Sequence, residues 1–322
     1  MLNRITLSDN VKLYILAVMA IVLTGLFLFA GLDAENYRYF LSRRTPKVLA
    51  MVLASIAIAQ SSLTFQTITN NRILTPGIMG FDSLYLLTQV LVVVLLGATS
   101  AAVLNPMLNF GLSVVVMVVF SMLLFGFYFR GQGGNVLVLL LLGVIFGQLF
   151  SNVASFFTML MDPNDFATVQ ANMFASFNNI NRELVYYNAI PLLVVCVLMF
   201  RMHRVLDVFW LDRDNAVSLG VPVEKVTRNV LILSAILIAI STALVGPVLF
   251  FGLLVANLSR ELFNTYRHRT LLVASSLLSV SMILGGQWLV ENLFSFETTL
   301  SVIINFAGGL YFLSLLVRQK IQ

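Results

Sequence analysis

The side chains that most often carry chemistry are few in this sequence and stand far apart. The chain has two histidines, His203 and His268, each near arginines in a short polar segment, and one cysteine, Cys196, within an apolar run. No set of His, Cys, Asp and Glu has the spacing of metal ligands, and no GxxxxGK[ST] loop is present to bind ATP. We therefore expect no catalytic residue, no metal site and no cofactor bound by this chain. Both histidines are expected to be solvated interface residues.

The polar side chains in the middle of the apolar segments are uncharged. Such residues either line a water-filled path or hydrogen-bond between helices, and the sequence leaves both alternatives open. Ion-coupled transporters usually keep ionisable groups within the membrane, so a chain with none in the middle of a span is expected to take energy from a partner. The residues concerned are Gln60, Ser61, Ser62, Thr64, Gln66, Gln89, Gln148, Asn152, Ser241, Thr242, Asn257, Gln287 and Asn305.

The elements that must position these residues are hydrophobic helices. Apolar residues make up 59% of the 322 positions and charged residues 10%, whereas soluble domains carry about 25% charged residues. A helix crosses a bilayer with roughly 20 apolar residues, so we predict an all-α membrane protein, a single transmembrane domain over 1–322. The ten predicted spans are 12–32, 46–68, 82–97, 104–127, 135–158, 186–203, 228–245, 247–260, 270–292 and 299–317. Segments 47–61 and 229–242 resemble each other, which predicts a pseudo-repeated helical bundle.

The distribution of basic residues predicts the orientation. With the N-terminus in the cytoplasm, fourteen of the 19 Lys and Arg residues fall in inside segments and five outside. This bias follows the positive-inside rule and predicts that both termini are cytoplasmic. It also accounts for the pI near 9.5, so nucleic-acid binding is not needed to explain the basic composition. Most of the basic residues on the outside form one cluster at the start of the second span. These side chains either snorkel at a helix start or bind a partner. The cluster contains Arg38, Arg43, Arg44 and Lys47.

The longest inside segment, 204–226, contains the signals of a short helix. Asp212 or Asp214 can cap its N-terminus, Gly220 suits its C-terminal end, and Pro222 prevents its continuation. The alternatives are a lever that contacts a partner and an ordinary helix in the membrane interface. The apolar residues expected on its exposed surface are Ala216, Val217 and Leu219.

Four segments resemble, in the same order, motifs of one transporter family. Residues 44–50 (RTPKVLA) resemble R-x-P-R-x-L-A, 71–80 (NRILTPGIMG) resemble N-P-L-A-x-P-x-x-L-G, and 246–255 (GPVLFFGLLV) resemble G-P-I-x-F-V-G-L-V-V. Residues 214–221 (DNAVSLGV) resemble the cytoplasmic loop of the same proteins. The proteins that carry these motifs are the permeases of iron-siderophore, haem and cobalamin importers, which are the FecCD-like type II ABC importers. Gly246 and Pro247 are expected to break the helix pair around them.

The resemblance implies the type II ABC importer permease fold of ten helices in the bacterial inner membrane. A second permease, a copy or a paralogue, would complete the path, and two ATPase subunits would bind ATP and Mg. An external siderophore-binding protein, periplasmic or lipid-anchored, would dock on Arg43, Arg44 and Lys47, and Asn71 and Ile73 would belong to the cytoplasmic gate. The ATPase subunits would dock on Asp212, Arg213, Asp214, Ala216, Val217, Leu219 and Gly220.

The chain also departs from the family pattern. Glu291-Asn292 stand where a basic residue is usual, and Ala256-Asn257 replace a common Pro-His. With residues 75–83, these departures resemble a subgroup that handles catecholate siderophores. The expected function is a permease subunit that moves a ferric siderophore by alternating access. The alternatives are a permease of the same family for haem or cobalamin, an ion-coupled secondary transporter, a membrane-embedded enzyme and a non-transporting assembly protein.

Overall fold

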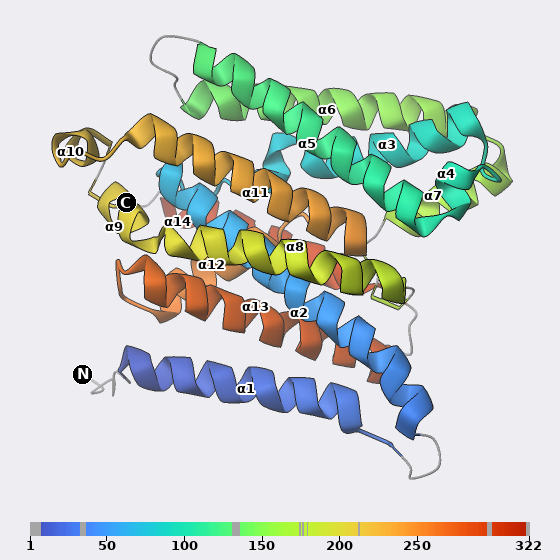
Figure 1. Ribbon diagram of the computed structural model, residues 1–322, viewed down its shortest axis with the longest axis horizontal. Helices are drawn as coiled ribbons and strands as arrows, with labels where there is room; N and C mark the ends of the chain where they lie inside the picture. Colours follow the sequence, from blue (N-terminus) through green and yellow to red (C-terminus); the bar gives the residue numbers. More distant parts are fainter. Residues whose placement is uncertain are drawn as a thin grey trace.

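The computed structural model describes residues 8–32, 37–130, 136–211 apart from 174, 176 and 179, 213–294 and 298–319. Helices account for nearly all of these residues and no strand occurs among them, so the all-α prediction is confirmed (Figure 1). In chain order they are α1 (Asp9–Phe29), α2 (Tyr37–Ile68), the 3-10 helix η1 (Pro76–Met79), α3 (Phe81–Leu96), α4 (Ala101–Leu104), α5 (Pro106–Arg130), α6 (Val136–Leu160), α7 (Pro163–Met173), α8 (Arg182–Arg201), α9 (His203–Phe209), α10 (Arg213–Ser218), α11 (Val223–Val245), α12 (Phe251–Leu262), α13 (His268–Asn292) and α14 (Leu300–Gln319).

Seven of the helices in the described ranges are long and apolar enough to cross a bilayer, with mean hydropathies from 1.5 to 2.4. They are α1, α2, α5, α6, α8, α11 and α13. Two shorter apolar helices, α3 and α14, and the twelve-residue α12 correspond to the remaining predicted spans. Each of the ten predicted ranges therefore coincides over most of its length with one of these helices.

Helix α2 forms the centre of the bundle. It packs against α1, α8, α11, α12 and α13, and 83% of its most apolar window is buried, against 17% for α1. Small residues such as Ala50, Ala54 and Ala57 are fully buried along it and let neighbouring helices approach closely. The outer helices instead expose many large apolar side chains, as expected of a surface in contact with lipid.

The predicted start of the second span at residue 46 is wrong, because α2 begins at Tyr37 and includes Pro46. A proline is favoured at the first turn of a helix, but Pro46 lies inside α2. Within α2, Pro46 removes only one backbone N–H, and the preceding Thr45 hydroxyl donates to the Leu41 carbonyl at 2.7 Å. The basic cluster therefore lies on an extension of α2 rather than in a loop.

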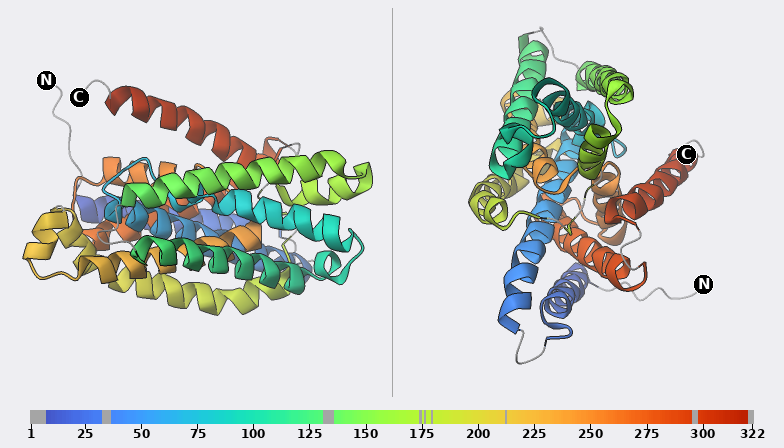
Figure 2. Two further views of the ribbon diagram at one scale, coloured as in Figure 1. Left: turned by 90° about the horizontal axis from the view of Figure 1, so that it is seen from above. Right: turned by 90° about the vertical axis from the view of Figure 1, so that its right-hand side faces the viewer.

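The two ends of the bundle carry different short helices. Helices α9 and α10 lie at the end where α1 begins and α14 finishes, whereas α4 and α7 lie at the other (Figures 1 and 2). We call these the α10 end and the α7 end. The α10 end also holds the loop of residues 69–75 after α2, because the cavity beside that loop is lined by residues of α9 and α12.

A glycine contact joins η1 to α6. Gly80 ends η1 with a φ of 86°, a conformation that favours glycine. A Cβ on Gly80 would lie 2.6 Å from the Cα of Gly147, so the two backbones touch. This contact holds the turn between the residue-69–75 loop and α3 against α6.

Candidate functional site

Helix α10 projects from the bundle and leaves an apolar surface uncovered. It contacts only α9 and α11 to a notable extent, and Val217 and Leu219 are 57% and 63% exposed. Gly220 ends the helix with a φ of 79°, and the Val221 N–H donates to the Ala216 carbonyl at 3.0 Å, as in a Schellman motif. A rigid, capped helix with exposed apolar residues is suited to docking on another protein.

One residue expected on that exposed surface is buried. Ala216 is fully buried in the main hydrophobic core, so the expectation that it is exposed is wrong. In a helix of six residues, neighbours in sequence point in different directions, and the interface with α9 and α11 takes up the side that carries Ala216. Asp212, with the side chains of Arg213 and Asp214, lies outside the part of the chain that the structure describes.

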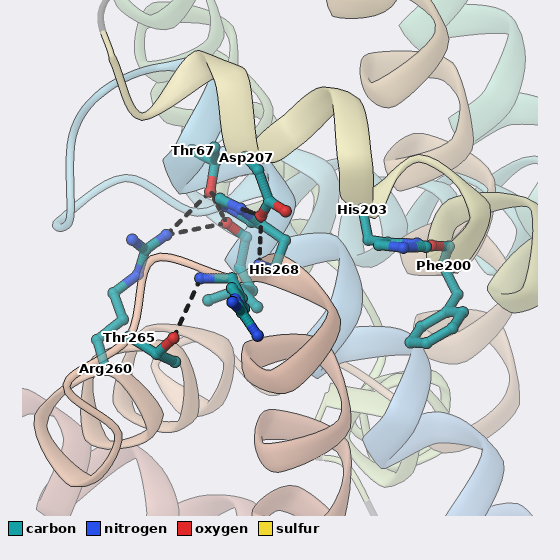
Figure 3. A network of polar contacts seen from close by, with 9 residues as sticks. Thr67, Phe200, His203, Asp207, Arg260, Thr265 and His268 are labelled. Carbon is teal, nitrogen blue, oxygen red and sulfur yellow. Dashed lines mark hydrogen bonds and ion pairs between the residues drawn. The ribbon is translucent and has the colours of Figure 1, made fainter. Parts of the chain in front are cut away.

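Helix α9, which leads into α10, is anchored to α13 and α2 by a buried histidine (Figure 3). His268 Nδ1 lies 2.9 Å from Asp207 Oδ1, and the same oxygen accepts the His268 backbone N–H at 2.5 Å. On the other side of the ring, Nε2 lies 2.8 Å from the Thr67 hydroxyl. A neutral ring with its proton on Nδ1 satisfies both contacts. The residues of three helices, α9, α13 and α2, are thereby joined.

Arg260 of α12 extends this network. Its guanidinium donates to the Thr67 hydroxyl at 3.0 Å and to the Leu63 carbonyl at 3.3 Å. Figure 3 shows Arg260 reaching toward Thr67 from the opposite side to Asp207. A buried arginine is stabilised when its donors find acceptors, and here the last turns of α2 supply two acceptors for Nη2.

The expectation that both histidines are solvated is wrong for His268, which is 0% exposed. His203 is half-buried, and its Nδ1 lies 2.9 Å from the Phe200 carbonyl. Sequence reasoning missed the role of His268 because its partners are 61 and 201 residues away. No group of three or more His, Cys, Asp and Glu that would hold a metal ion occurs among the residues described.

The predicted gate residues lie in the loop after α2, whose backbone is held by side chains. The Asn71 Oδ1 accepts the Ile73 N–H at 2.9 Å. The Arg72 carbonyl accepts from Gln66 Nε2 at 2.7 Å and from Asn257 Nδ2 at 2.8 Å. These bonds fix the loop against α2 and α12, beside a cavity of about 490 Å³.

At the α7 end, Lys47 is already paired within the chain. It forms an ion pair with Glu291 of α13 and donates to Asn178 Oδ1 at 2.9 Å. Gln287 Nε2 donates to Glu291 at 2.9 Å and to Asn178 at 2.8 Å. Glu291, the residue that departs from the family pattern, therefore neutralises Lys47.

The other two predicted docking residues have different surroundings. Arg44 donates to the Ala30 and Leu28 carbonyls at 2.6 and 3.3 Å, so it closes the end of α1 onto α2. Arg43 is exposed, with its guanidinium carbon 5.1 Å from the centre of the Tyr39 ring. Of the three, Arg43 makes its cationic group most available to a partner.

The neutral polar residues have two kinds of surroundings. Gln89 donates to Asn109 and Ser113 of α5 at 2.9 and 3.0 Å, so it joins two helices. Gln287 and Asn257 instead join their helices to loops, through the Asn178 side chain and the Arg72 carbonyl. Gln148 and Asn152, in contrast, are exposed on α6, where the Gln148 Nε2 donates to the Asn152 Oδ1 at 3.1 Å.

The chain turns between α11 and α12 at the predicted glycine and proline. Helix α11 ends at Val245, Gly246 has a φ of 92°, and α12 begins at Phe251. The break brings Gly252 close to α2, because a Cβ on Gly252 would lie 2.0 Å from the Ser62 hydroxyl oxygen. Arg260 thus reaches Thr67 from a helix that packs directly on α2.

Comparison with known proteins places these features in a family. The chain is 49% identical over 314 residues to the petrobactin import system permease protein YclO of Bacillus subtilis (strain 168), covering 98% of this chain and 99% of that protein. It is 33% identical to the petrobactin import system permease protein FatC of Bacillus anthracis, covering 97% and 91%. A metal-chelate type ABC transporter, solved in an inward-facing conformation, has the same fold, with a TM-score of 0.83, 22% identity and coverage of 96% and 99%.

The resemblance found in the four motifs is therefore confirmed over nearly the whole chain. Residues 7–318 match the family described as the FecCD transport family. The fold prediction, a type II ABC importer permease, is confirmed by the structural likeness. This protein belongs to the FecCD transport family.

Proposed function

We propose that the chain is one permease domain, spanning 1–322, of an ATP-driven importer for ferric siderophores of the catecholate type, petrobactin among them. The observation that carries this proposal is 49% identity, over 98% of the chain, to a permease of a petrobactin import system. Petrobactin is a siderophore of the catecholate type. The chain supplies the path across the membrane, while separate subunits hydrolyse ATP and capture the substrate.

The α10 end faces the cytoplasm of a bacterial cell, in the inner membrane, and receives two ATPase subunits that bind ATP and Mg. The excess of Lys and Arg in the segments at this end supports the orientation. Val217 on α10 and Leu219 directly after it are exposed, which supports ATPase docking there. Movement of α10 is passed to α13 and α2, because α9 is tied to both through Asp207, His268 and Thr67.

The substrate path runs beside α6 and is completed by a second permease, either a copy of this chain or a paralogue. Gln148 and Asn152 are exposed on a helix whose mean hydropathy is 1.9. An amide facing lipid loses hydrogen bonds to water, so a water-filled path between two permeases accounts for these residues better than a lipid-facing position. Alternating access closes this path first at one end and then at the other.

The α7 end receives an external siderophore-binding protein, soluble in the periplasm or anchored by lipid. Arg43 provides the cationic group most open to an acidic partner. Arg44 holds the turn that presents it, and Lys47 contributes its charge only when the partner displaces Glu291.

The test is uptake of radiolabelled ferric petrobactin by proteoliposomes that contain the assembled importer, its binding protein and internal ATP. We expect uptake that requires all components and stops when the ATPase subunits are omitted. Parallel assays with haem and cobalamin test the same-family alternatives. Uptake of haem or cobalamin with none of ferric petrobactin would overturn the substrate assignment, and uptake without the ATPases would favour a secondary transporter.

A further inference from the structure

The cavity beside the loop of residues 69–75 brings two arginines to one tryptophan. The guanidinium carbons of Arg260 and Arg72 lie 5.1 and 5.9 Å from the centre of the Trp210 ring. The cavity has a volume of about 490 Å³, which is within the usual range of small-molecule sites. Its lining residues are Gln66, Thr67, Asn70, Asn71, Arg72, Phe209, Trp210 and Arg260.

The described lining of this cavity carries positive charge only. Among the residues that the structure describes, it contains two arginines and no Asp or Glu, and neither arginine has an ion-pair partner in that part of the chain. Asp207, on the neighbouring helix α9, is engaged by His268. Two guanidinium groups without carboxylates favour an anion in the space between them.

Two buried polar atoms of the lining are also without partners. Arg260 is 9% exposed and Gln66 is 2% exposed, and neither Arg260 Nε nor Gln66 Oε1 has a hydrogen-bond partner in the part of the chain described. Leaving such buried atoms unpaired destabilises the protein, because they have lost their hydrogen bonds to water. Nε needs an acceptor and Oε1 a donor, so a ligand with both an anionic oxygen and a hydroxyl or amide N–H would satisfy the pair.

One of the two cationic groups is held in place before any ligand arrives. The Arg260 guanidinium donates to the Thr67 hydroxyl and the Leu63 carbonyl, whereas the side chain of Arg72 is exposed and only its backbone carbonyl is held, by Gln66 and Asn257. Preorganised groups lose little entropy on binding. The Arg260 guanidinium is therefore already in position for a ligand in the cavity.

We propose that this cavity binds an aromatic anion of the catecholate type and holds the ferric siderophore at the α10 end before release. Oxyanions of the ligand accept from Arg72 and Arg260, a ligand hydroxyl or amide N–H donates to Gln66, and a ligand ring packs against Phe209 and Trp210. The inference rests on the proposed function, since it assigns to the imported complex a site at the cytoplasmic end of its path.

Phosphate and anionic lipid headgroups also carry anionic oxygens that arginines bind. The experiment therefore distinguishes the siderophore from these two ligands. The assembled importer, without its binding protein and without nucleotide, is placed in nanodiscs of phosphatidylcholine, and binding of radiolabelled ferric petrobactin is measured at equilibrium. Inorganic phosphate and the iron-free siderophore serve as competitors. A second set of nanodiscs contains phosphatidylglycerol.

We expect saturable binding that Arg72→Gln weakens about 10-fold or more, because the variant loses a charge-assisted hydrogen bond to the ligand. Arg72→Lys, which keeps the charge but loses the fork of donors, is expected to weaken binding less. Arg269→Gln is the matched control, since Arg269 is an exposed arginine of the same end that does not line the cavity. Arg260→Gln tests the buried partner, with thermal unfolding as the check on its fold.

The outcomes distinguish this site from the proposed function. Equal binding by wild type and Arg72→Gln, with uptake intact in both, would overturn the site while leaving the importer assignment in place. Complete competition by phosphate, or loss of binding in phosphatidylglycerol alone, would overturn the catecholate specificity in favour of a general anion or a headgroup. Absence of both binding and uptake would overturn the site and the function together.

Discussion

The carboxylate of Asp207 accepts two hydrogen bonds from His268, one from the ring Nδ1 at 2.9 Å and one from the backbone N–H at 2.5 Å. This pair fixes the start of α13 to α9, the helix that precedes α10. Because α10 is exposed and α13 is packed against α2, a force applied at α10 has a short, hydrogen-bonded route into the bundle.

The first prediction concerns this anchor. We expect Asp207→Ala to lower the free energy of unfolding by about 1–3 kcal/mol, because it leaves the Nδ1–H of a fully buried histidine without an acceptor. Asp207→Asn is the matched control, since its amide oxygen can still accept both bonds. Thermal unfolding of the purified importer checks the ranking, and an Asp207→Ala midpoint equal to that of wild type would contradict the anchor.

The second prediction concerns α10 as the coupling helix. Leu219→Asp is expected to abolish stimulation of ATP hydrolysis by the binding protein, because a charge replaces an apolar side chain that is 63% exposed for docking. Membrane insertion should be unaffected. Leu262→Asp, which makes the same change at a 45% exposed leucine of the α10 end, serves as the control. Normal ATPase stimulation in Leu219→Asp would exclude this surface as the ATPase contact.

The third prediction concerns the ion pair of Lys47 and Glu291, whose side chains are 18% and 22% exposed. Lys47→Met alone should destabilise the protein, because Glu291 then keeps a largely buried charge without its partner. Adding Glu291→Gln should recover part of the loss. We expect a coupling energy of about 1–2 kcal/mol, between the values for surface and buried pairs. Additive effects in the double-mutant cycle would show that the pair contributes nothing.

The fourth prediction separates Arg43 from its basic neighbours. Arg43→Glu should weaken association with the binding protein, most strongly at low salt, because exposed charges act over a distance set by ionic strength. Arg182→Glu makes the same charge reversal at an exposed arginine at the start of α8 and is expected to have a smaller effect. Surface plasmon resonance at two salt concentrations measures both. Equal affinity for wild type and Arg43→Glu at low salt would return Arg43 to a purely snorkelling role.

The fifth prediction concerns the glycine contact between η1 and α6. A Cβ on Gly147 would lie 2.9 Å from the Gly80 Cα, so Gly147→Ala should cost about 1–3 kcal/mol through overpacking. Gly111→Ala is the matched control in α5, where a Cβ meets nothing within 4 Å. That change should be neutral or stabilise the helix by up to about 1 kcal/mol. Thermal unfolding of the two variants compares them, and equal midpoints would contradict the close approach.

The sequence alone determined that this chain is an all-α membrane protein, where its long helices fall, and to which family it belongs. These properties are local: apolar runs of a given length, a Gly-Pro pair between α11 and α12, and motifs of seven to ten residues. Each can be read without knowing which helices are neighbours. Its one clear error in a predicted span, the start of α2, arose at Pro46, where a proline that often begins a helix lies inside one.

Only the tertiary structure decided which distant side chains meet. Lys47 and Glu291 are 244 residues apart, and Thr67 and His268 are 201 apart. The burial of His268, the neutralisation of Lys47 and the placement of Arg72 and Arg260 on one tryptophan all depend on how α2 packs among α9, α12 and α13. The physical reason is that hydropathy fixes which segments enter the membrane, whereas pairing within it depends on the fit and hydrogen bonding of one helix surface against another.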